Sequence, residues 1–212
     1  MEKKKVLKII LGIIVLIVIA CAIYFIRNYI IINKIATKQS EITSSSNYSY
    51  ISELYTGEDK TVIEYYYKDG ININILKKNN IESEVIWYDE NNKEQITMQV
   101  DELTANVINT ENGFKCSMPS QIVENNINDK IDLALRSLIS YDEVNGEKCY
   151  AIKRFIGVTT TIPYVSMKNG EVLKIALPDN KAIEYKEFKI NNLTDEDVKR
   201  PDLTGYKVTY NK

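Results

Sequence analysis

The chain of 212 residues contains no histidine. This absence removes the commonest general base, the Ser-His-Asp arrangement and most zinc sites. A glycine-rich phosphate loop and a Gly-x-Ser-x-Gly elbow are also missing from the sequence. Three carboxylates gather at Asp195–Asp197, but no glycine follows them as a calcium loop requires, and carboxylates in the first turn of a helix explain the cluster. We therefore expect a protein that is not an enzyme and holds no metal and no cofactor.

Cysteine is scarce as well, with three residues at Cys21, Cys116 and Cys149. Cys116 and Cys149 are not in a Cys-x-x-Cys spacing, so a thioredoxin-like redox motif is excluded. Outside the cytoplasm these two thiols can form a disulfide, which would stabilise the domain by about 3–4 kcal/mol. They can equally be two half-buried thiols that pack as small hydrophobic groups. Both interpretations stay open at this point.

What the chain does have is a long hydrophobic run near its N-terminus. No side chain is charged from Ile9 to Ile26, and a helix of roughly 20 such residues spans a bilayer core about 30 Å thick. The basic leader Met1–Lys5 is expected to stay in the cytoplasm by the positive-inside rule. We therefore predict a single-pass cell-membrane protein, with leader and anchor at residues 1–33 and an extracytoplasmic domain at residues 34–212.

Two other origins are conceivable for the hydrophobic run. A cleaved signal peptide has a shorter apolar core and a small-residue cleavage site, whereas the apolar character here continues through Tyr24 and Phe25. The sequence Val18–Cys21 is similar to a bacterial lipobox, in which Cys21 would be lipidated. Residues Ala22–Ile26 are apolar, whereas a mature lipoprotein usually turns polar after its cysteine. With either a helix or a lipid anchor, the domain is tethered to a membrane.

Charge is distributed unevenly along the chain. Residues 1–38 carry a net charge of +6 and the remaining residues carry −8. Nucleic-acid binding depends on neutralising phosphates with basic side chains. The acidic domain therefore predicts no nucleic-acid partner, even though Tyr65–Tyr67 provides neighbouring aromatic rings.

Beyond the anchor, apolar residues alternate with polar ones, which is the period of a β-strand. Alternating stretches lie at 61–68, 71–75, 84–87 and 96–100, and Asp69–Gly70 is a hairpin turn signal. This pattern predicts an antiparallel meander with one apolar and one polar face. Further strands are expected at 148–155, 162–167, 173–177 and 183–190. In the last one the alternation changes phase between Tyr185 and Phe188, which indicates either a bulge or a change of packed face.

Two helices are expected within the domain. Apolar residues recur three and four positions apart between Ile122 and Ile139, which indicates a helix that lies on the sheet and is capped by Ser120 or Asn128. A second, short helix is expected to begin at Thr194 and to end at Pro201.

Three stretches together resemble the bacterial lipoprotein-carrier superfamily, the LolA-like and RseB-like half-barrels. They are the meander around Glu64–Gly70, the turn and strand at Asn145–Tyr150, and the closing run from Tyr185 to Asp202. The resemblance covers roughly Lys34–Tyr210. It lies in the order and the type of these segments, and it includes no diagnostic motif. It implies an α+β fold in which the anchor is followed by a strongly curved antiparallel sheet, a half-barrel, with helices on its concave face. No ligand residue of the family can be matched here.

The resemblance and the apolar strand faces lead to one main functional prediction. We expect a membrane-anchored, extracytoplasmic module that binds a lipid, a lipidated protein or another apolar ligand. The alternative is a protein-interaction or regulatory domain of the cell envelope without a small ligand. A third interpretation is that the apolar faces only form the core. The candidate ligand-binding residues are Ile73, Ile75, Trp87, Ile96, Met98, Leu173, Ile175 and Tyr185.

Overall fold

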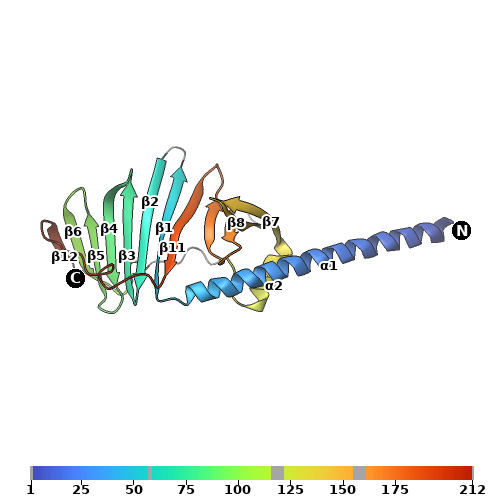
Figure 1. Ribbon diagram of the computed structural model, residues 1–212, viewed down its shortest axis with the longest axis horizontal. Coiled ribbons are helices and arrows are strands. Elements are labelled where there is room, and N and C mark those ends of the chain that lie inside the picture. The colour runs from blue at the N-terminus through green and yellow to red at the C-terminus, as the bar shows by residue number, and fades with distance from the viewer. Residues whose placement is uncertain (1, 57–58, 116–121, 155–160, 212) are drawn as a thin grey trace.

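The computed structural model describes residues 2–56, 59–115, 122–154 and 161–211. These residues form two α-helices and one large sheet. Helix α1 (Glu2–Thr43) is a single continuous helix, so the hydrophobic run and residues 27–43 after it are one element. Its N-terminal half projects away from the rest of the molecule (Figure 1). The segment Lys5–Ile42 is long and apolar enough to cross a membrane.

The sheet has twelve strands within the described part of the chain, in the spatial order β12-β6-β5-β4-β3-β2-β1-β11-β10-β9-β8-β7. The strands are β1 (Asn47–Thr56), β2 (Asp59–Lys68), β3 (Ile71–Lys78), β4 (Ile81–Asp89), β5 (Glu94–Gln99), β6 (Thr104–Asn109), β7 (Ser137–Val144), β8 (Glu147–Arg154), β9 (Ile162–Ser166), β10 (Val172–Ala176), β11 (Ala182–Ile190) and β12 (Lys207–Asn211). The predicted α+β half-barrel is confirmed: the open sheet is curved, and the C-terminal half of α1 packs on its β7–β9 part (Figure 1). The sheet is mixed rather than wholly antiparallel, because β12 pairs in parallel with β6.

Local sequence signals account for the turns and for an irregularity in β11. Asp69 and Gly70 both have positive φ, 49° and 90°, as a two-residue hairpin turn requires. Between Ser49 and Ile51 of β1, the partner strand β11 advances by three residues instead of two. The extra residue is accommodated where Glu187 adopts φ 51°. Of the two alternatives predicted between Tyr185 and Phe188, the bulge is therefore confirmed.

The helices differ from prediction in detail. Helix α2 (Ile127–Arg136) lies within the expected range, but its N-cap is Asn126, whose side-chain oxygen accepts from the backbone N–H of Asp129 at 2.9 Å. The expected helix at Thr194 is absent from this described segment, which forms a turn instead. The Asp197 carboxylate accepts from both the backbone N–H and the hydroxyl of Thr194 at 2.7 Å, so a helix-start interaction closes a single turn.

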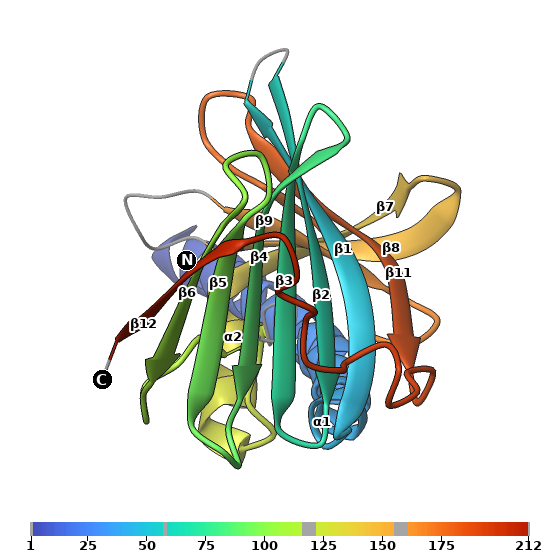
Figure 2. The ribbon, with the colours of Figure 1, turned by 90° about the vertical axis from the view of Figure 1, so that its left-hand side faces the viewer.

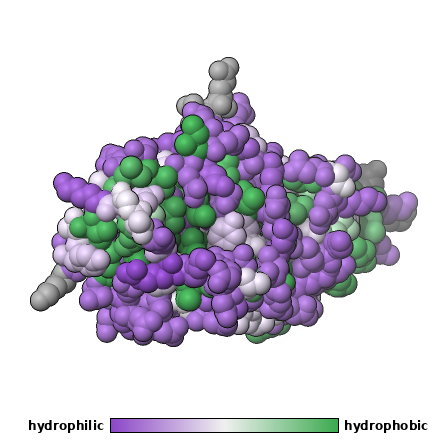
Figure 3. All heavy atoms as spheres, turned by 60° about the vertical axis from the view of Figure 1, so that its left-hand side comes forward, coloured by the Kyte–Doolittle hydropathy of each residue, from purple (hydrophilic) through white to green (hydrophobic). Residues whose placement is uncertain are grey.

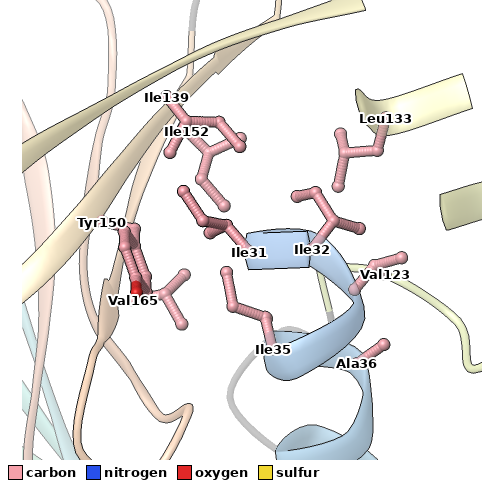
Figure 4. Packing of buried hydrophobic residues seen from close by; sticks show 10 residues of the cluster. All are labelled: Ile31, Ile32, Ile35, Ala36, Val123, Leu133, Ile139, Tyr150, Ile152 and Val165. Carbon is pink, nitrogen blue, oxygen red and sulfur yellow. The ribbon is translucent and has the colours of Figure 1, made fainter. Parts of the chain in front are cut away.

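The concave face holds one of two hydrophobic cores. Ile31, Ile32 and Ile35 of α1 point toward side chains of β7, β8, β9 and α2 (Figure 4). Ile32 is fully buried and Ile35 is 1% exposed. The core residues drawn in Figure 4 are Ile31, Ile32, Ile35, Ala36, Val123, Leu133, Ile139, Tyr150, Ile152 and Val165. The second half of α1 is thus a structural part of the domain.

The convex face holds the second core, which the chain covers with its own C-terminal segment. Residues 191–206 cross in front of the sheet, while α1 and α2 lie behind it (Figure 2). Leu193 and Val198 of this segment pack on Ile73 and Trp87, and the Trp87 indole N–H donates to the Val198 carbonyl at 3.0 Å. On the side shown in Figure 3, hydrophobic residues are visible in a group toward the left and between hydrophilic residues in the middle.

Candidate functional site

An apolar hollow lies on the concave face, beside the α1 core. It has a volume of about 370 Å³. Its lining residues come from β8–β11 and from the segments next to these strands: Ile122, Ile152, Arg154, Thr161, Pro163, Ile175, Leu177, Ile183 and Tyr185. Most of them are aliphatic or aromatic, so the hollow can receive an apolar group.

Strand register explains why these residues meet. Pro163 of β9 lies opposite Ile175 of β10, and Ile175 lies opposite Ile183 of β11. Because directly paired residues point to the same side of a sheet, the three side chains form a row across three strands. Tyr185 follows Ile183 by two positions and extends the row along β11.

The rim of the hollow is more polar than its floor. Arg154 is exposed at the end of β8, and no ion pair joins it to any residue in the described ranges. An unneutralised guanidinium at the mouth of an apolar hollow suits an anionic head group, because it offers up to five N–H donors in a planar fork.

A cluster of aromatic rings continues the concave face from the hollow toward β2. The ring centroid of Tyr50 lies 6.0 Å from that of Tyr185 and 4.5 Å from that of Tyr65. Tyr48 and Tyr67 form a further pair at 5.0 Å. Tyr48 and Tyr50 are each 4% exposed, so these two side chains are structural rather than available to a ligand.

The predicted ligand residues are divided among three places. Ile175 and Tyr185 line the concave hollow. Leu173 lines a second depression, which includes Val144 and Glu171 and shares Tyr185 with the hollow. The other five belong to the convex core, where Ile75 packs at its margin and the remaining four are buried: Ile73, Trp87, Ile96 and Met98.

Several lining residues were not among the predicted set, namely Ile122, Ile152, Arg154, Pro163, Leu177 and Ile183. The alternation of Ile183 with Tyr185 was a usable signal, since both must lie on one face of the strand. The contribution of Ile122 had no sequence signal, because it depends on how the segment after the meander returns to α1. The Ile122 backbone N–H donates to the Gln39 side chain at 3.1 Å.

A charged cluster lies on the convex face at Glu53, which is 7% exposed. Burial alone would raise the pKa of Glu53. Hydrogen bonds from Lys186 at 2.6 Å, from Lys60 and from Tyr55 outweigh burial and lower the pKa to about 2. The carboxylate is therefore ionised and held by two cations, which is the arrangement of a structural ion cluster.

The pKa of a second carboxylate, Glu171, is raised rather than lowered. Burial, together with the nearby Glu147 carboxylate, raises the pKa of Glu171 to about 7. Glu171 lies in the hairpin after β9, which α1 holds through Lys38 and Gln39: the Gln39 amide donates to the Gly170 carbonyl at 3.1 Å. A group that titrates near neutrality thus lies beside the joint between α1 and the sheet.

The three cysteines have separate surroundings. Cys21 is exposed within α1. Cys149 is buried, and burial raises the pKa of its thiol to about 11, with Asp142 and Glu147 adding to the shift. Cys116 lies outside the described residues, so its pairing with Cys149 stays a prediction. Among the described residues, no group of cysteine and carboxylate side chains is arranged to hold a metal ion.

Comparison with known proteins adds information on the fold. No family model and no curated protein matches the chain. An uncharacterised conserved protein from Thermus thermophilus matches with a TM-score of 0.52 at 12% identity, over 84% of this chain and 98% of that one. At this identity the likeness shows a shared fold and nothing of activity.

MucB structures also match, at lower scores. MucB aligns with a TM-score of 0.48 at 8% identity, over 79% of this chain and 62% of that one. The MucA/MucB complex of Pseudomonas aeruginosa aligns with a TM-score of 0.46 at 9% identity, over 84% of this chain and 63% of the other. The chain thus spans less than two thirds of the matched MucB chains, and similarity at these scores says nothing of function.

Proposed function

We propose that this protein is a single-pass, membrane-anchored module that binds an apolar ligand outside the cytoplasm, without catalysing a reaction. The ligand class is a lipid or the acyl chain of a lipidated protein. The observation that carries the proposal is the apolar hollow on the concave face between β8 and β11. Its volume of about 370 Å³ lies within the range of small-molecule pockets.

The chemistry of the hollow supports an amphipathic ligand. The row Pro163–Ile175–Ile183 offers contact to a hydrocarbon chain. Arg154 stands at the rim, where a carboxylate or phosphate head group would remain accessible to water. Membership of the lipoprotein-carrier superfamily, which the sequence resembles, would agree with this ligand class and remains part of the proposal.

A binding titration tests the proposal. The full chain is reconstituted in phosphatidylcholine nanodiscs and titrated with a fluorescent fatty acid, and partition into empty nanodiscs is subtracted. We expect saturable binding that weakens at least tenfold in Ile183→Trp, because the larger ring fills the hollow. Arg154→Gln should weaken a fatty acid more than the matching fatty alcohol, since only the acid presents a charge.

A matched control is available on the same strand. Ile190 is 39% exposed and lies outside the hollow, so Ile190→Trp should bind the probe as the unmodified chain does. Absence of saturable uptake, or equal uptake by Ile183→Trp, would favour the alternative of a protein-interaction domain without a small ligand.

A further inference from the structure

The edge strand β7 lies directly against α1 at the point where the hydrophobic run ends. The Tyr24 hydroxyl donates to the Ser137 carbonyl at 2.8 Å, and the Asn28 amide donates to the same carbonyl at 3.0 Å. Arg27 donates to the Ile139 carbonyl at 3.2 Å, and its guanidinium lies 5.3 Å from the ring centroid of Tyr141. Three successive odd-numbered positions of β7 are thus held by one turn of α1.

The other strands meet α1 farther along the helix. Ile31 and Ile35 point toward side chains of β8 and β9 (Figure 4). The hairpin after β9 is held by Lys38, which donates to the Met167 carbonyl at 3.1 Å. Successive strands of the sheet are therefore stacked along α1, with β7 nearest the hydrophobic half of the helix (Figure 1).

Helix geometry sets the height of β7 relative to a bilayer. The uncharged run Ile9–Ile26 is about 27 Å long at a rise of about 1.5 Å per residue, which nearly equals the hydrocarbon thickness. Arg27 is the first charged residue after this run, so it lies at the boundary between hydrocarbon and head groups. Because Arg27 contacts both Ile139 and Tyr141, the edge strand must lie at that boundary too.

The surface at this height exposes apolar and basic side chains, and the acidic Asp142 and Glu143 lie farther along β7. Leu135 at the end of α2, Leu138 and Tyr141 are 60%, 45% and 62% exposed, and the last two project from opposite faces of the edge strand β7. Arg136, which forms an ion pair with Asp132 at 2.8 Å, and Lys153 are exposed beside them, and Leu138 is paired directly with Lys153 across β7 and β8. Exposed leucine and tyrosine with flanking basic side chains are typical of segments that sit among lipid head groups.

We propose that β7 and the C-terminal end of α2 form a bilayer-contact surface, on which Leu135, Leu138 and Tyr141 enter the lipid interface and fix the domain against the membrane. The occupant is lipid rather than a second copy paired along the strand edge. An added strand needs free edge carbonyls, whereas those of Ser137 and Ile139 already accept from α1. This inference rests on the anchor in the proposed function.

Site-specific photocrosslinking tests the surface in the full chain, reconstituted in vesicles of phosphatidylcholine and phosphatidylglycerol. The variants Leu138→p-benzoylphenylalanine and Leu135→p-benzoylphenylalanine are irradiated, and lipid adducts are measured by mass spectrometry. The control is Leu103→p-benzoylphenylalanine, since Leu103 is 54% exposed and lies between β5 and β6, at the opposite end of the sheet. We expect at least tenfold more lipid adduct at positions 135 and 138 than at 103.

Two results would overturn the inference. One is an equal lipid yield at all three positions, and the other is a protein–protein adduct at position 138, which would indicate an interface between copies. Washing the vesicles at alkaline pH separates this test from that of the anchor. Protein that is released by the wash refutes the anchor, whereas protein that is retained without lipid adducts refutes only the contact surface.

Discussion

The two faces of the sheet bury similar apolar residues in different ways. On the convex face, Leu193 and Val198 of the chain's own C-terminal segment cover the row that includes Trp87. On the concave face, α1 covers β7–β9 but leaves the row Pro163–Ile175–Ile183 beside a hollow. Apolar alternation is required for folding on both faces, so only the uncovered part of one face is available for a ligand.

The largest expected effect comes from the convex core. Ile96 is fully buried, and Ile96→Ala should lower the free energy of unfolding by about 2–5 kcal/mol through lost contacts and a cavity. Urea unfolding in detergent micelles, followed by Trp87 fluorescence, measures this loss. Ligand affinity of the folded variant should be unchanged. A parallel loss of probe binding would show that the two faces are not independent.

The Glu53 cluster gives the next effect, and its sign follows from the lowered pKa. A carboxylate with pKa about 2 when folded and about 4.5 when unfolded stabilises the fold above pH 4.5 and loses that contribution as the pH falls toward 2. Glu53→Gln should therefore lower the free energy of unfolding by about 1–3 kcal/mol at pH 7. The free energy of unfolding of this variant should also fall less steeply as the pH decreases. Unfolding curves between pH 2 and 7 test this, and an unchanged acid slope would contradict it.

Glu171 lies at the joint between α1 and the concave side. Its contribution to stability depends on pH in the opposite direction to that of Glu53. Its pKa of about 7 in the folded state exceeds the unfolded value of 4.5, so its contribution is present below pH 4.5 and is lost as the pH rises through 7. At pH 8 the free energy of unfolding of Glu171→Gln should exceed that of the parent chain by roughly 1–3 kcal/mol, a range that allows for screening by solvent. At pH 4 the variant and the parent chain should have nearly equal free energies of unfolding. A difference that stays constant between pH 4 and 8 would exclude titration of Glu171 as its cause.

The smallest effect tests how the C-terminal cover is attached. Arg200 makes two hydrogen bonds to the Glu94 carboxylate, at 2.9 and 3.0 Å, from a partly exposed position. Arg200→Gln should lower the free energy of unfolding by no more than about 1 kcal/mol, because exposed ion pairs contribute little to stability. Hydrogen exchange near Val198 should nevertheless accelerate. Lys199→Gln, which removes the more exposed pair with Glu196, is the matched control and should leave exchange there unchanged.

Most of the fold followed from local patterns. Positive-φ turns at Asp69–Gly70 and a change of phase within 183–190 are set by neighbouring residues, and both appear in the structure as expected. Strands β1, β6 and β7 were missed. The sequence of β1 from Asn47 to Thr56 alternates poorly between apolar and polar residues. The turn at Thr194 was mistaken for a helix, because a capping interaction does not specify how many turns follow.

The candidate site was less accessible to sequence reasoning. Period two tells which residues share a face of one strand, and it correctly placed Ile175 and Tyr185 on apolar faces. It does not tell which face the rest of the chain will cover. Trp87 and Ile183 have the same local pattern, yet residues 191–206 bury the first and leave the second beside a hollow.

The sequence by itself determined a long apolar helix, a strand-rich acidic domain and the turns between its strands, because these depend on side-chain periodicity and on backbone preferences within a few residues. The tertiary structure alone decided that α1 continues into the concave core, that the C-terminal segment covers the convex core, and that β7 lies where the hydrophobic run ends. These arrangements depend on contacts between residues about a hundred positions apart, such as Tyr24 with Ser137 and Trp87 with Val198.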